Sequence, residues 1–455
     1  MYSTDKAYMK FESIINFLTN HIYFTFFFFA GIFVLLRILK RENHHNTAVK
    51  LLDKAIKSSM NEPLTLHPEI DPAMCAGCGA CTKVCPEGDI LKMINHKAVL
   101  VGPTKCVGHG ECERACPYDA IKLVFGTKAR GMDIPRVSAN YETNVSGLYI
   151  AGELGGMGLI RNAIKQGILA AQHALSQNSN DKYDYDILVV GAGPAGLAAS
   201  LTAIANKKKY LTIEQGGFGG AVYNFPRQKI VMSHPFELPL VGKMKFQSNK
   251  VSKEQLLEYW NDVKKKTNLK VTEDTQFMGL EKFGNGFKVK TNRGEFSSRK
   301  VILAMGVRGS PRKLGVPGED KSKVTYNLLD PEQYQNCDVV VVGGGNAGVE
   351  SAQMLGEARW KNRVHLLVRS ATFDRCNEDN IKRITDMEKK GLVKIWYNSS
   401  VIQIDESEIK IKIDTDLVTI KNNYVFVFAG AELPHKFLMS LGIEIDKKFG
   451  QTKAG

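Results

Sequence analysis

The sequence DILVVGAGPAGLAAS, residues 186–200, decides the fold of most of this 455-residue chain. An apolar run suited to a buried strand ends at Val190 and leads into Gly191, Gly193 and Gly196, after which an alanine-rich stretch suits a helix. In a strand-turn-helix unit of this kind, the glycines allow a tight turn, admit a pyrophosphate close to the backbone and let the helix pack on the strand. The stretch therefore predicts a doubly wound α/β domain that binds a dinucleotide.

An acidic residue and a second glycine pattern extend this prediction. The next strand, LTIE, ends in Glu214 about 20 residues after the glycines, where an acid accepts hydrogen bonds from ribose hydroxyls. The same pattern of strand, glycine turn and helix occurs in CDVVVVGGGNAGVES, residues 337–351, with its glycines at Gly343, Gly345 and Gly348. The chain therefore predicts two Rossmann-like domains, each with its own dinucleotide.

The second unit differs from the first at the end of its second strand. RVHLLV, residues 363–368, is followed by Arg369 and Ser370 rather than by an acid, and Arg375 is close in sequence. An arginine accommodates the 2′-phosphate that an acid would repel, so we expect NADPH rather than NADH in this domain. The alternative is that Arg369 is an ordinary surface arginine.

Seven of the nine cysteines lie in two runs, CAGCGACTKVCP at 75–86 and CVGHGECERACP at 106–117. This is the spacing of bacterial ferredoxins, in which three thiolates of a run bind one iron-sulfur cluster and the fourth binds the other. We therefore expect two 4Fe-4S clusters. Because the fourth cysteine of each run binds the other cluster, the ligands expected for one cluster are Cys75, Cys78, Cys81 and Cys116. The other takes Cys85, Cys106 and Cys112.

The second run has His109 where a further cysteine would stand, flanked by Gly108 and Gly110. Imidazole is a competent but less usual ligand of iron-sulfur clusters. Ligation by His109, and a loop histidine beside a three-iron or open centre, both stay open. Structural zinc fits less well because zinc modules pair Cys-x-x-Cys elements. Disulfides fit less well because the rest of the chain suits an enzyme among cytosolic reductants.

Near the amino terminus, residues 14–36 read IINFLTNHIYFTFFFFAGIFVLL, contain no charged residue and are about long enough to cross a bilayer as one helix. Residues 37–57 hold six Lys or Arg against two acids, which favours a cytoplasmic location for the rest of the chain. We expect a single-pass anchor in the inner, cytoplasmic membrane. A cleaved signal fits less well because no small-residue cleavage site comes after the apolar stretch. Asn16, Asn20 and His21 leave a buried hairpin helix as an alternative.

The net charge of +14 bears on partners. A basic surface is usually only solvated, but it also favours an anionic membrane leaflet and an acidic electron-carrier protein such as a ferredoxin or flavodoxin. No segment interleaves aromatic and basic residues in the manner of nucleic-acid-binding proteins, so we expect no nucleic acid partner.

From Tyr185 to Gly450 the chain resembles the pyridine-nucleotide flavoprotein reductases of the thioredoxin-reductase type. The resemblance rests on both glycine patterns, on AMGVRGSPRKLGVPGE at 304–319 and on VFVFAGAELP at 425–434. It implies FAD in the first nucleotide domain, NADPH in the second, and a homodimer. Reductases of this type carry a redox Cys-x-x-Cys before the second pattern, but here YNLLDPEQYQNC offers Cys337 alone, so no dithiol relay is expected.

A second departure from that type of reductase concerns the order of segments. TNVSGLYIAGELGGMGLIRNAIKQGILAA, residues 143–171, is similar to the segment that closes the FAD domain at the carboxyl end of such reductases. The resemblance implies a circularly permuted FAD domain, which compact domains tolerate. A plain strand-helix linker is the alternative. The implied flavin contacts are Gly152 and Glu153, and the helix start at Arg161, Asn162 and Ala163.

The predicted fold class is α/β, with two doubly wound domains, a small α+β ferredoxin-like domain and an amino-terminal transmembrane helix. The predicted segments are the anchor and basic stretch 1–63, the iron-sulfur domain 64–127, the displaced FAD segment 128–178, the FAD domain 179–319, the NADPH domain 320–422 and the return to the FAD domain 423–455. Antiparallel hairpins are expected around 292–294 and over 401–413.

The expected function is that of an NAD(P)H-dependent, FAD-containing oxidoreductase. It would move electrons between NADPH, FAD and the clusters, to or from a ferredoxin-like carrier. Two alternatives stay open. One is a reductase of a small disulfide or quinone with structural or sensory clusters, and the other is a membrane-tethered redox sensor or scaffold. No catalytic side chain is assigned.

Overall fold

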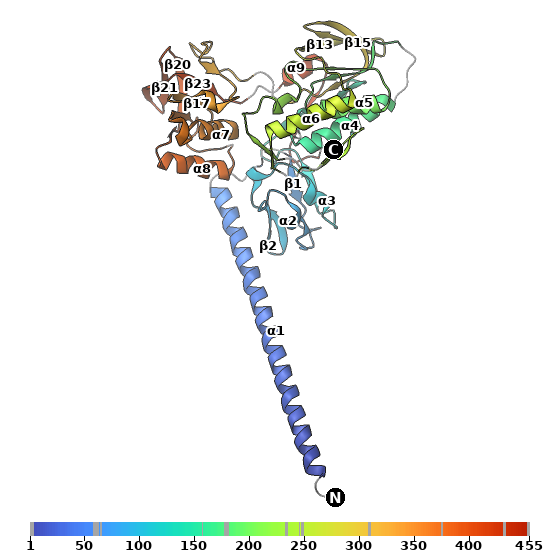
Figure 1. The fold of residues 1–455 in the computed structure, drawn as a ribbon, viewed down its shortest axis with the longest axis vertical. Helices are drawn as coiled ribbons and strands as arrows, with labels where there is room; N and C mark the ends of the chain where they lie inside the picture. Colours follow the sequence, from blue (N-terminus) through green and yellow to red (C-terminus); the bar gives the residue numbers. More distant parts are fainter. Residues whose placement is uncertain are drawn as a thin grey trace.

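The computed structural model describes residues 4–57, 63, 66–156, 158–176, 182–232, 235–244, 246, 250–307, 311–374, 376–430 and 434–452. Figure 1 shows two α/β domains side by side, a small module beneath them and one long helix, α1 (Thr4–Lys57), that projects away. The two larger domains are those that the two glycine patterns predict.

Helix α1 corrects the prediction of a membrane anchor. Within the described residues, the structure offers no helix with an apolar stretch long enough to cross a bilayer. The predicted transmembrane helix, and with it the location in the inner membrane, is therefore wrong.

The first α/β domain contains the first glycine pattern. Its sheet runs in the order β13 (Phe277–Phe283), β14 (Gly286–Thr291), β15 (Gly294–Leu303), β7 (Tyr185–Val190) and β8 (Tyr210–Ile213). Strands β15, β7 and β8 are parallel, whereas β13, β14 and β15 form an antiparallel flap with the hairpin turn that the sequence predicts. Helix α5 (Pro194–Ala205) follows β7 directly, so the glycine turn lies at the carboxyl end of the strand.

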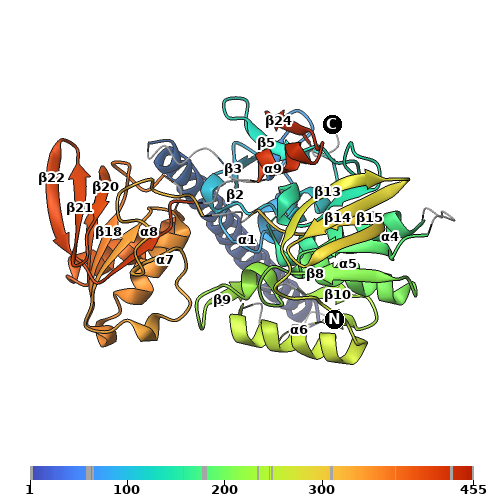
Figure 2. The same ribbon diagram turned by 90° about the horizontal axis from the view of Figure 1, so that it is seen from above.

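The segment that precedes this domain in sequence completes its sheet. Strand β6 (Leu148–Ile150) pairs in parallel with the end of β15. Helix α4 (Ile160–Ser176) lies beside α5, as Figure 2 shows. The two helices touch through backbone, because a Cβ on Gly167 would lie 2.1 Å from the carbonyl oxygen of Ala195. Glycine at this position therefore allows α4 to pack directly on the fingerprint helix.

The remaining elements of this domain lie between the two glycine patterns and after the second. They are β9 (Ile230–Met232), β10 (Phe236–Leu238), β11 (Gly242–Met244), β12 (Lys250–Ser252), α6 (Lys253–Thr267) and α9 (His435–Ser440). Helix α6 begins with a capping box at Ser252 and Gln255, and it buries Leu256 and Trp260 against α5 and β10 neighbours in one core. These elements cover the sheet and leave the glycine turn at its edge.

The second α/β domain contains the second glycine pattern. Its parallel sheet runs β16 (Val324–Thr325), β23 (Tyr424–Val427), β17 (Asp338–Val342), β18 (Arg363–Leu367) and β19 (Val393–Trp396). Its helices are α7 (Asn346–Leu355) and α8 (Glu378–Lys389). The hairpin predicted at 401–413 is part of a three-stranded sheet, β20 (Ser399–Ile404), β21 (Glu408–Ile413) and β22 (Asp416–Lys421).

The cysteines lie in a small α+β module, residues 66–125. Its elements are β1 (His67–Ile70), α2 (Ala80–Val84), β2 (Leu91–Ile94), β3 (Lys97–Leu100), α3 (Glu111–Arg114) and β4 (Ile121–Val124). Strand β1 pairs with β4, and β2 pairs with β3, both antiparallel. In Figure 1 the module lies below the two α/β domains, beside the upper end of α1.

Two backbone connections fix this module to the first α/β domain. Strand β5 (Met132–Pro135) leaves the module and pairs with β24 (Ile445–Lys448), near the carboxyl end of the chain. Beyond this pair, Phe125 and Gln451 form an antiparallel bridge with a hydrogen bond of 2.9 Å from the Phe125 amide. Segments more than 300 residues apart therefore hold the module in place.

Candidate functional site

The first glycine turn has the geometry of a dinucleotide site. Gly191 has φ +99°, and a Cβ there would lie 2.6 Å from the carbonyl oxygen of Ala304. A Cβ on Gly196 would lie 1.8 Å from the carbonyl oxygen of Gly191, so helix and strand are in direct backbone contact. A Cβ on Gly193, by contrast, would find its nearest atom at 3.9 Å. The turn therefore leaves open space at the start of α5, where free backbone amides favour a phosphate.

Glu214 lies at this turn, as the sequence predicts. Its buried carboxylate accepts from the amide of Ala192 at 2.7 Å and from the amide of Gly216 at 3.1 Å. Each carboxylate oxygen has a second lone pair, so the side chain retains capacity to accept from a ribose hydroxyl.

The segment at 143–171 also reaches this turn, through Gly152. Gly152, with φ +88°, approaches α5 so closely that a Cβ there would lie 3.1 Å from the Cβ of Ala195. The Gly152 amide donates to Oε1 of Gln166 at 2.8 Å. The other end of this side-chain amide, Nε2 of Gln166, is buried and has no hydrogen-bond partner among the described residues. A buried donor of this kind fits a bound group with acceptor oxygens, so the segment suits the first dinucleotide.

Glu153 and the helix start lie on the same segment. Glu153 opens a short 3₁₀ turn, η2 (Glu153–Gly155), and α4 begins at Ile160, so the residues predicted as flavin contacts are in its first turn. They are Arg161, Asn162 and Ala163. The first turn of a helix presents free amides and the positive end of its dipole, which favours an electron-rich ring edge.

The side chain of Arg161 makes a contact that the sequence did not predict. Its Nη2 donates to Oε1 of Glu111 at 2.5 Å, and Glu111 is the residue before Cys112. Hydrogen bonds from Arg114 and then from Arg161 lower the pKa of Glu111 to about 2. The helix start of the first domain is thus linked by an ion pair to the cysteine module. Partners 50 residues apart in sequence carry no local signal by which this pair could have been found.

The second glycine turn repeats the geometry of the first. Gly343 has φ +133°, and a Cβ there would lie 2.3 Å from the carbonyl oxygen of Phe428. A Cβ on Gly348 would lie 2.1 Å from the carbonyl oxygen of Gly343, whereas a Cβ on Gly345 would find nothing within 4 Å. The open space again lies at the start of a helix, α7, as a pyrophosphate requires.

Arg369 lies in the loop after β18 and is exposed, whereas Arg375 lies outside the described residues. The loop also carries Asp374, which accepts from the hydroxyls of Ser370 at 2.5 Å and Thr372 at 2.9 Å. The sequence prediction did not consider this acid. Arg369 is nevertheless at the end of the second strand, where the adenosine ribose of a dinucleotide is recognised.

The module brings the cysteines together in two groups that cross the two runs. Burial raises the pKa of Cys81, and the nearby thiols that raise it further are Cys75, Cys78 and Cys116. Burial raises the pKa of Cys112 to about 12, and the thiols that add to this are Cys106 and Cys85. Cys85 of the first run thus lies with cysteines of the second run, and Cys116 of the second run lies with cysteines of the first. This is the crossed pattern expected for two clusters.

The donor set of the two groups, cysteines in ferredoxin spacing, suits iron-sulfur clusters. Within the described part of the chain, no three Cys, His, Asp or Glu side chains converge as ligands of one metal ion. Burial also raises the pKa of Cys106 to about 11. Thiolates crowded and buried in this way need neutralising metal charge.

His109 lies near the second cysteine group. Its Nε2 lies 3.6 Å from Oε1 of Glu87, and its side chain is 9% exposed. Burial raises the pKa of both Cys85 and Cys106, and the charge of Glu87 adds to this rise. The loop is held closely, because a Cβ on Gly108, at φ +74°, would lie 2.8 Å from the carbonyl oxygen of Leu66.

The second group is the one that faces the first α/β domain. The thiol of Cys106 lies 3.9 Å from the carbonyl oxygen of Leu66, which packs with Phe125 and Ile134 in a buried cluster. A Cβ on Gly156, in the segment that leads to α4, would lie 2.7 Å from the ring of Phe125. The ion pair between Lys105 and Glu378, at 3.3 Å, links the same edge of the module to α8 of the second domain.

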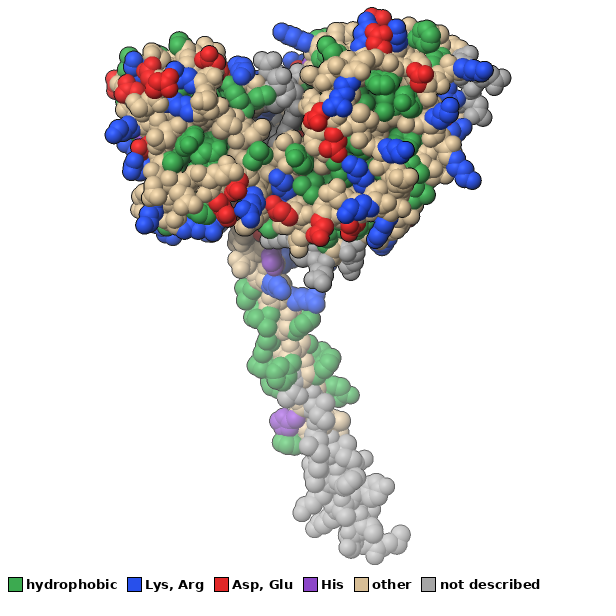
Figure 3. Space-filling model, turned by 45° about the horizontal axis from the view of Figure 1, so that its top comes forward, with side chains coloured by type: hydrophobic (Ala, Val, Ile, Leu, Met, Phe, Trp, Pro, Cys, Tyr) green, Lys and Arg blue, Asp and Glu red, His purple; other side chains and the backbone are tan. Residues whose placement is uncertain are grey.

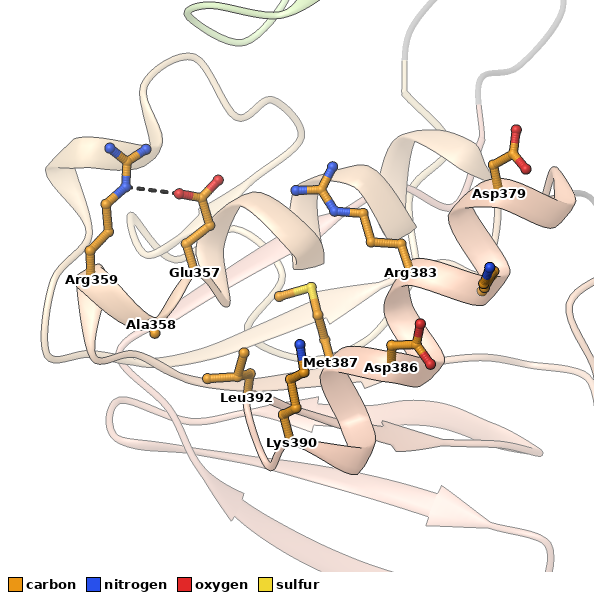
Figure 4. A pocket seen from close by; sticks show the side chains of 10 residues that line it. Glu357, Ala358, Arg359, Asp379, Arg383, Asp386, Met387, Lys390 and Leu392 are labelled. Carbon is orange, nitrogen blue, oxygen red and sulfur yellow. Dashed lines mark ion pairs between the residues drawn. The ribbon is translucent and has the colours of Figure 1, made fainter.

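Two hollows of the surface lie away from the predicted residues. Figure 4 shows one of about 630 Å³ between η5 (Ala358–Trp360) and α8, crossed by an ion pair of 2.8 Å between Arg359 and Glu357. A smaller one of about 360 Å³ lies between 227–230 and α7, where Lys229 and Glu350 pair at 2.9 Å. Neither hollow is lined by a glycine of the two turns or by a cysteine.

The comparisons with known proteins agree with this geometry. Residues 188–453 match the family described as pyridine nucleotide-disulphide oxidoreductase, and residues 67–117 match the 4Fe-4S dicluster domain. Bacilliredoxin reductase Bdr of Bacillus subtilis is 29% identical over 58% of this chain and 82% of that protein. The ferredoxin-NADP reductase of Ignicoccus hospitalis is 32% identical over 38% of this chain and 53% of that protein.

A solved structure supports the same assignment. Bacillithiol disulfide reductase Bdr of Staphylococcus aureus superimposes with a TM-score of 0.53 and 26% identity, over 58% of this chain and 82% of that chain. The chain belongs to the pyridine nucleotide-disulphide oxidoreductase family and is a flavin-dependent NAD(P)H oxidoreductase.

Proposed function

We propose that this protein moves electrons between NADPH and a ferredoxin-type carrier protein through FAD and two iron-sulfur clusters. The observation that carries the proposal is the contact between the cysteine module and the segment that reaches the first glycine turn. Arg161 pairs with Glu111 beside Cys112, and Gly156 packs on Phe125. These contacts bring the second cysteine group close to the segment that reaches the first glycine turn, and a short path favours electron transfer.

Backbone amides and side chains would both contribute to binding the two dinucleotides. The open space at Gly193 and at Gly345 would hold the pyrophosphates of FAD and NADPH. Glu214 and Glu153 would hold ribose or ribityl hydroxyls, and the first turn of α4 would favour the electron-rich edge of the flavin. When bound, FAD accepts a hydride and releases single electrons, which iron-sulfur clusters carry.

Two clusters fit the two cysteine groups. In the first, Cys75, Cys78, Cys81 and Cys116 would supply four thiolates. In the second, Cys85, Cys106 and Cys112 would supply three, and His109 would be the fourth ligand. Glu87, 3.6 Å from the His109 ring, would orient the imidazole, as a carboxylate commonly does for a ligating histidine. The homodimer stays a prediction.

Anaerobic addition of NADPH is the direct test. The flavin absorbance should bleach first, and an iron-sulfur paramagnetic signal should appear afterwards, because the electrons reach the clusters only through the flavin. Rapid mixing with absorbance detection and freeze-quenched paramagnetic resonance would measure the two steps. Bleaching of the flavin with the clusters left oxidised would refute the proposal.

The alternative function, reduction of a small disulfide, has support in the names of the Bdr relatives. One thiol outside the module, Cys376, does not favour it. Burial, and then Glu350, raise the pKa of Cys376 to about 12, so this thiol stays protonated near neutral pH. Turnover of small disulfides that survives Cys75→Ala and Cys112→Ala would favour this alternative, and negligible turnover with every acceptor would favour a sensor or scaffold.

Selectivity for NADPH is a further expectation. Arg369→Ala should lower kcat/KM for NADPH about tenfold and leave that for NADH unchanged, because a hydrogen bond to a charged group contributes roughly 1.5 kcal/mol or more. Steady-state kinetics with both cofactors would measure this. Arg359→Ala, which removes an exposed arginine on the same domain, is the control and should change neither value. An equal loss with both cofactors would show that Arg369 does not contact the 2′-phosphate.

A further inference from the structure

We propose that a small acidic electron-carrier protein docks on the surface around Cys78, an inference that rests on the function proposed above. We call this surface the Cys78 face. It is formed by Arg41 and His45 of α1, by Cys78 of the first cysteine run and Met74 just before that run, by His96 of the turn between β2 and β3, and by Lys97 at the start of β3.

The exposure of the cysteines points to this face. Among the seven cysteines of the module, Cys78 is exposed and the others are buried or half-buried. Met74, four residues before it, is 48% exposed and adds an apolar contact. Electron transfer slows steeply with distance, so a partner gains most where a ligand reaches the surface. The second cysteine group faces the first α/β domain instead, through Leu66 and Phe125.

The elements around Cys78 are packed together closely. A Cβ on Gly77 would lie 2.2 Å from the carbonyl oxygen of His96, so the cysteine loop lies directly against the β2–β3 turn. Lys97 Nζ donates to the carbonyl oxygen of Cys75 at 2.7 Å. On the outer side, Arg41 contacts the ring of His96, and His45 lies 3.1 Å from the side-chain oxygen of Asn95. Helix α1 thus places its basic residues at the rim of the face.

The charge of this region is complementary to an acidic protein. Its cations are Arg41 and Lys97, with Arg37 and Lys40 within one turn of Arg41 on α1. The acids beside them are Glu42 on the same helix and Asp71, whose carbonyl oxygen accepts from the Cys75 amide. Figure 3 shows Lys and Arg side chains in blue and a histidine in purple at the upper end of the projecting helix, where it meets the rest of the molecule. Complementary charges at the rim of an interface speed association and make it salt-dependent.

The test uses the full-length protein with matched flavin, iron and sulfide content and an acidic bacterial ferredoxin as the probe. Calorimetry at low and at higher salt gives the Kd. Arg41→Glu and Lys40→Glu should each raise the Kd about tenfold at low salt and flatten its salt dependence. Lys40→Glu leaves the contact between Arg41 and His96 in place, so it reports charge alone. Lys412→Glu, an exposed lysine on β21, is the matched control and should bind as the unaltered protein does.

The outcomes separate this inference from the proposed function. An unchanged Kd in both α1 variants, or no binding at either salt, would overturn the Cys78 face even if the carrier is reduced. Binding that is lost in the α1 variants, with no reduction of the carrier by the unaltered protein, would support the face and refute the function. A change in the sedimentation of the carrier-free protein on Arg41→Glu would show that a second copy of the chain occupies the face, which also overturns the inference.

Discussion

Replacement of Cys116 by serine is expected to abolish the same paramagnetic signal as replacement of Cys75, although the two cysteines lie in different runs. The reason is that Cys116, with Cys75 and Cys78, surrounds Cys81. A cluster that loses one of four thiolates is not retained, so each variant should lose about half of its iron. Paramagnetic resonance of the reduced protein and iron analysis would measure both effects.

The second cysteine group supplies the complementary variants. Cys85→Ser should abolish the signal that Cys112→Ser abolishes, because both thiols lie beside Cys106. All four variants should lose reduction of the carrier while NADPH still bleaches the flavin. Cys337→Ser, outside the module, should keep both signals. If the Cys116→Ser variant and the Cys112→Ser variant lose the same paramagnetic signal, the crossed grouping is disproved.

Replacement of Gly345 by valine should leave the protein folded and nearly unable to use NADPH. A Cβ at this position meets nothing within 4 Å, and the backbone at φ −84° suits any residue. The valine methyls would occupy the space predicted for the pyrophosphate and block its hydrogen bonds to the amides at the start of α7. Loss of two such bonds, about 3 kcal/mol, raises the KM for NADPH roughly 100-fold. Stopped-flow reduction of the flavin would measure it.

Gly348→Val is the matched comparison for this result. A Cβ on Gly348 would lie 2.1 Å from the carbonyl oxygen of Gly343, so the helix must move away from the strand. This variant should lower the melting temperature, because overpacking against backbone costs about 1–3 kcal/mol or more. Gly345→Val should melt as the unaltered protein does. A Gly345→Val protein that binds NADPH normally would show that the cofactor does not lie at this turn.

The glycine turns and Glu214 were predictable because their signal is local. A strand, a turn and a helix occupy some fifteen consecutive residues, and the spacing of the glycines reports close backbone approach within that stretch. The structure places Gly196 and Gly348 in the same role, each against the carbonyl oxygen of the first glycine of its own turn.

The prediction of an anchor, which is wrong, came from the composition of the sequence alone. A count of apolar residues over 14–36 treats the stretch as one uniform span. Within the residues that the structure describes, no helix has an apolar stretch of the length that a bilayer requires. A bilayer span needs about 20 consecutive, predominantly apolar residues.

The sequence by itself determined the chemistry that this protein can hold: two dinucleotide turns, thiolates in ferredoxin spacing, and a lone Cys337 in place of a redox pair. Only the tertiary structure decided which groups are neighbours. Glu111 meets Arg161, and Phe125 packs against Gly156, across 30 to 50 residues of chain. Such contacts depend on how whole elements pack. Burial of apolar surface is non-directional, so the local sequence carries no pattern that identifies the partners.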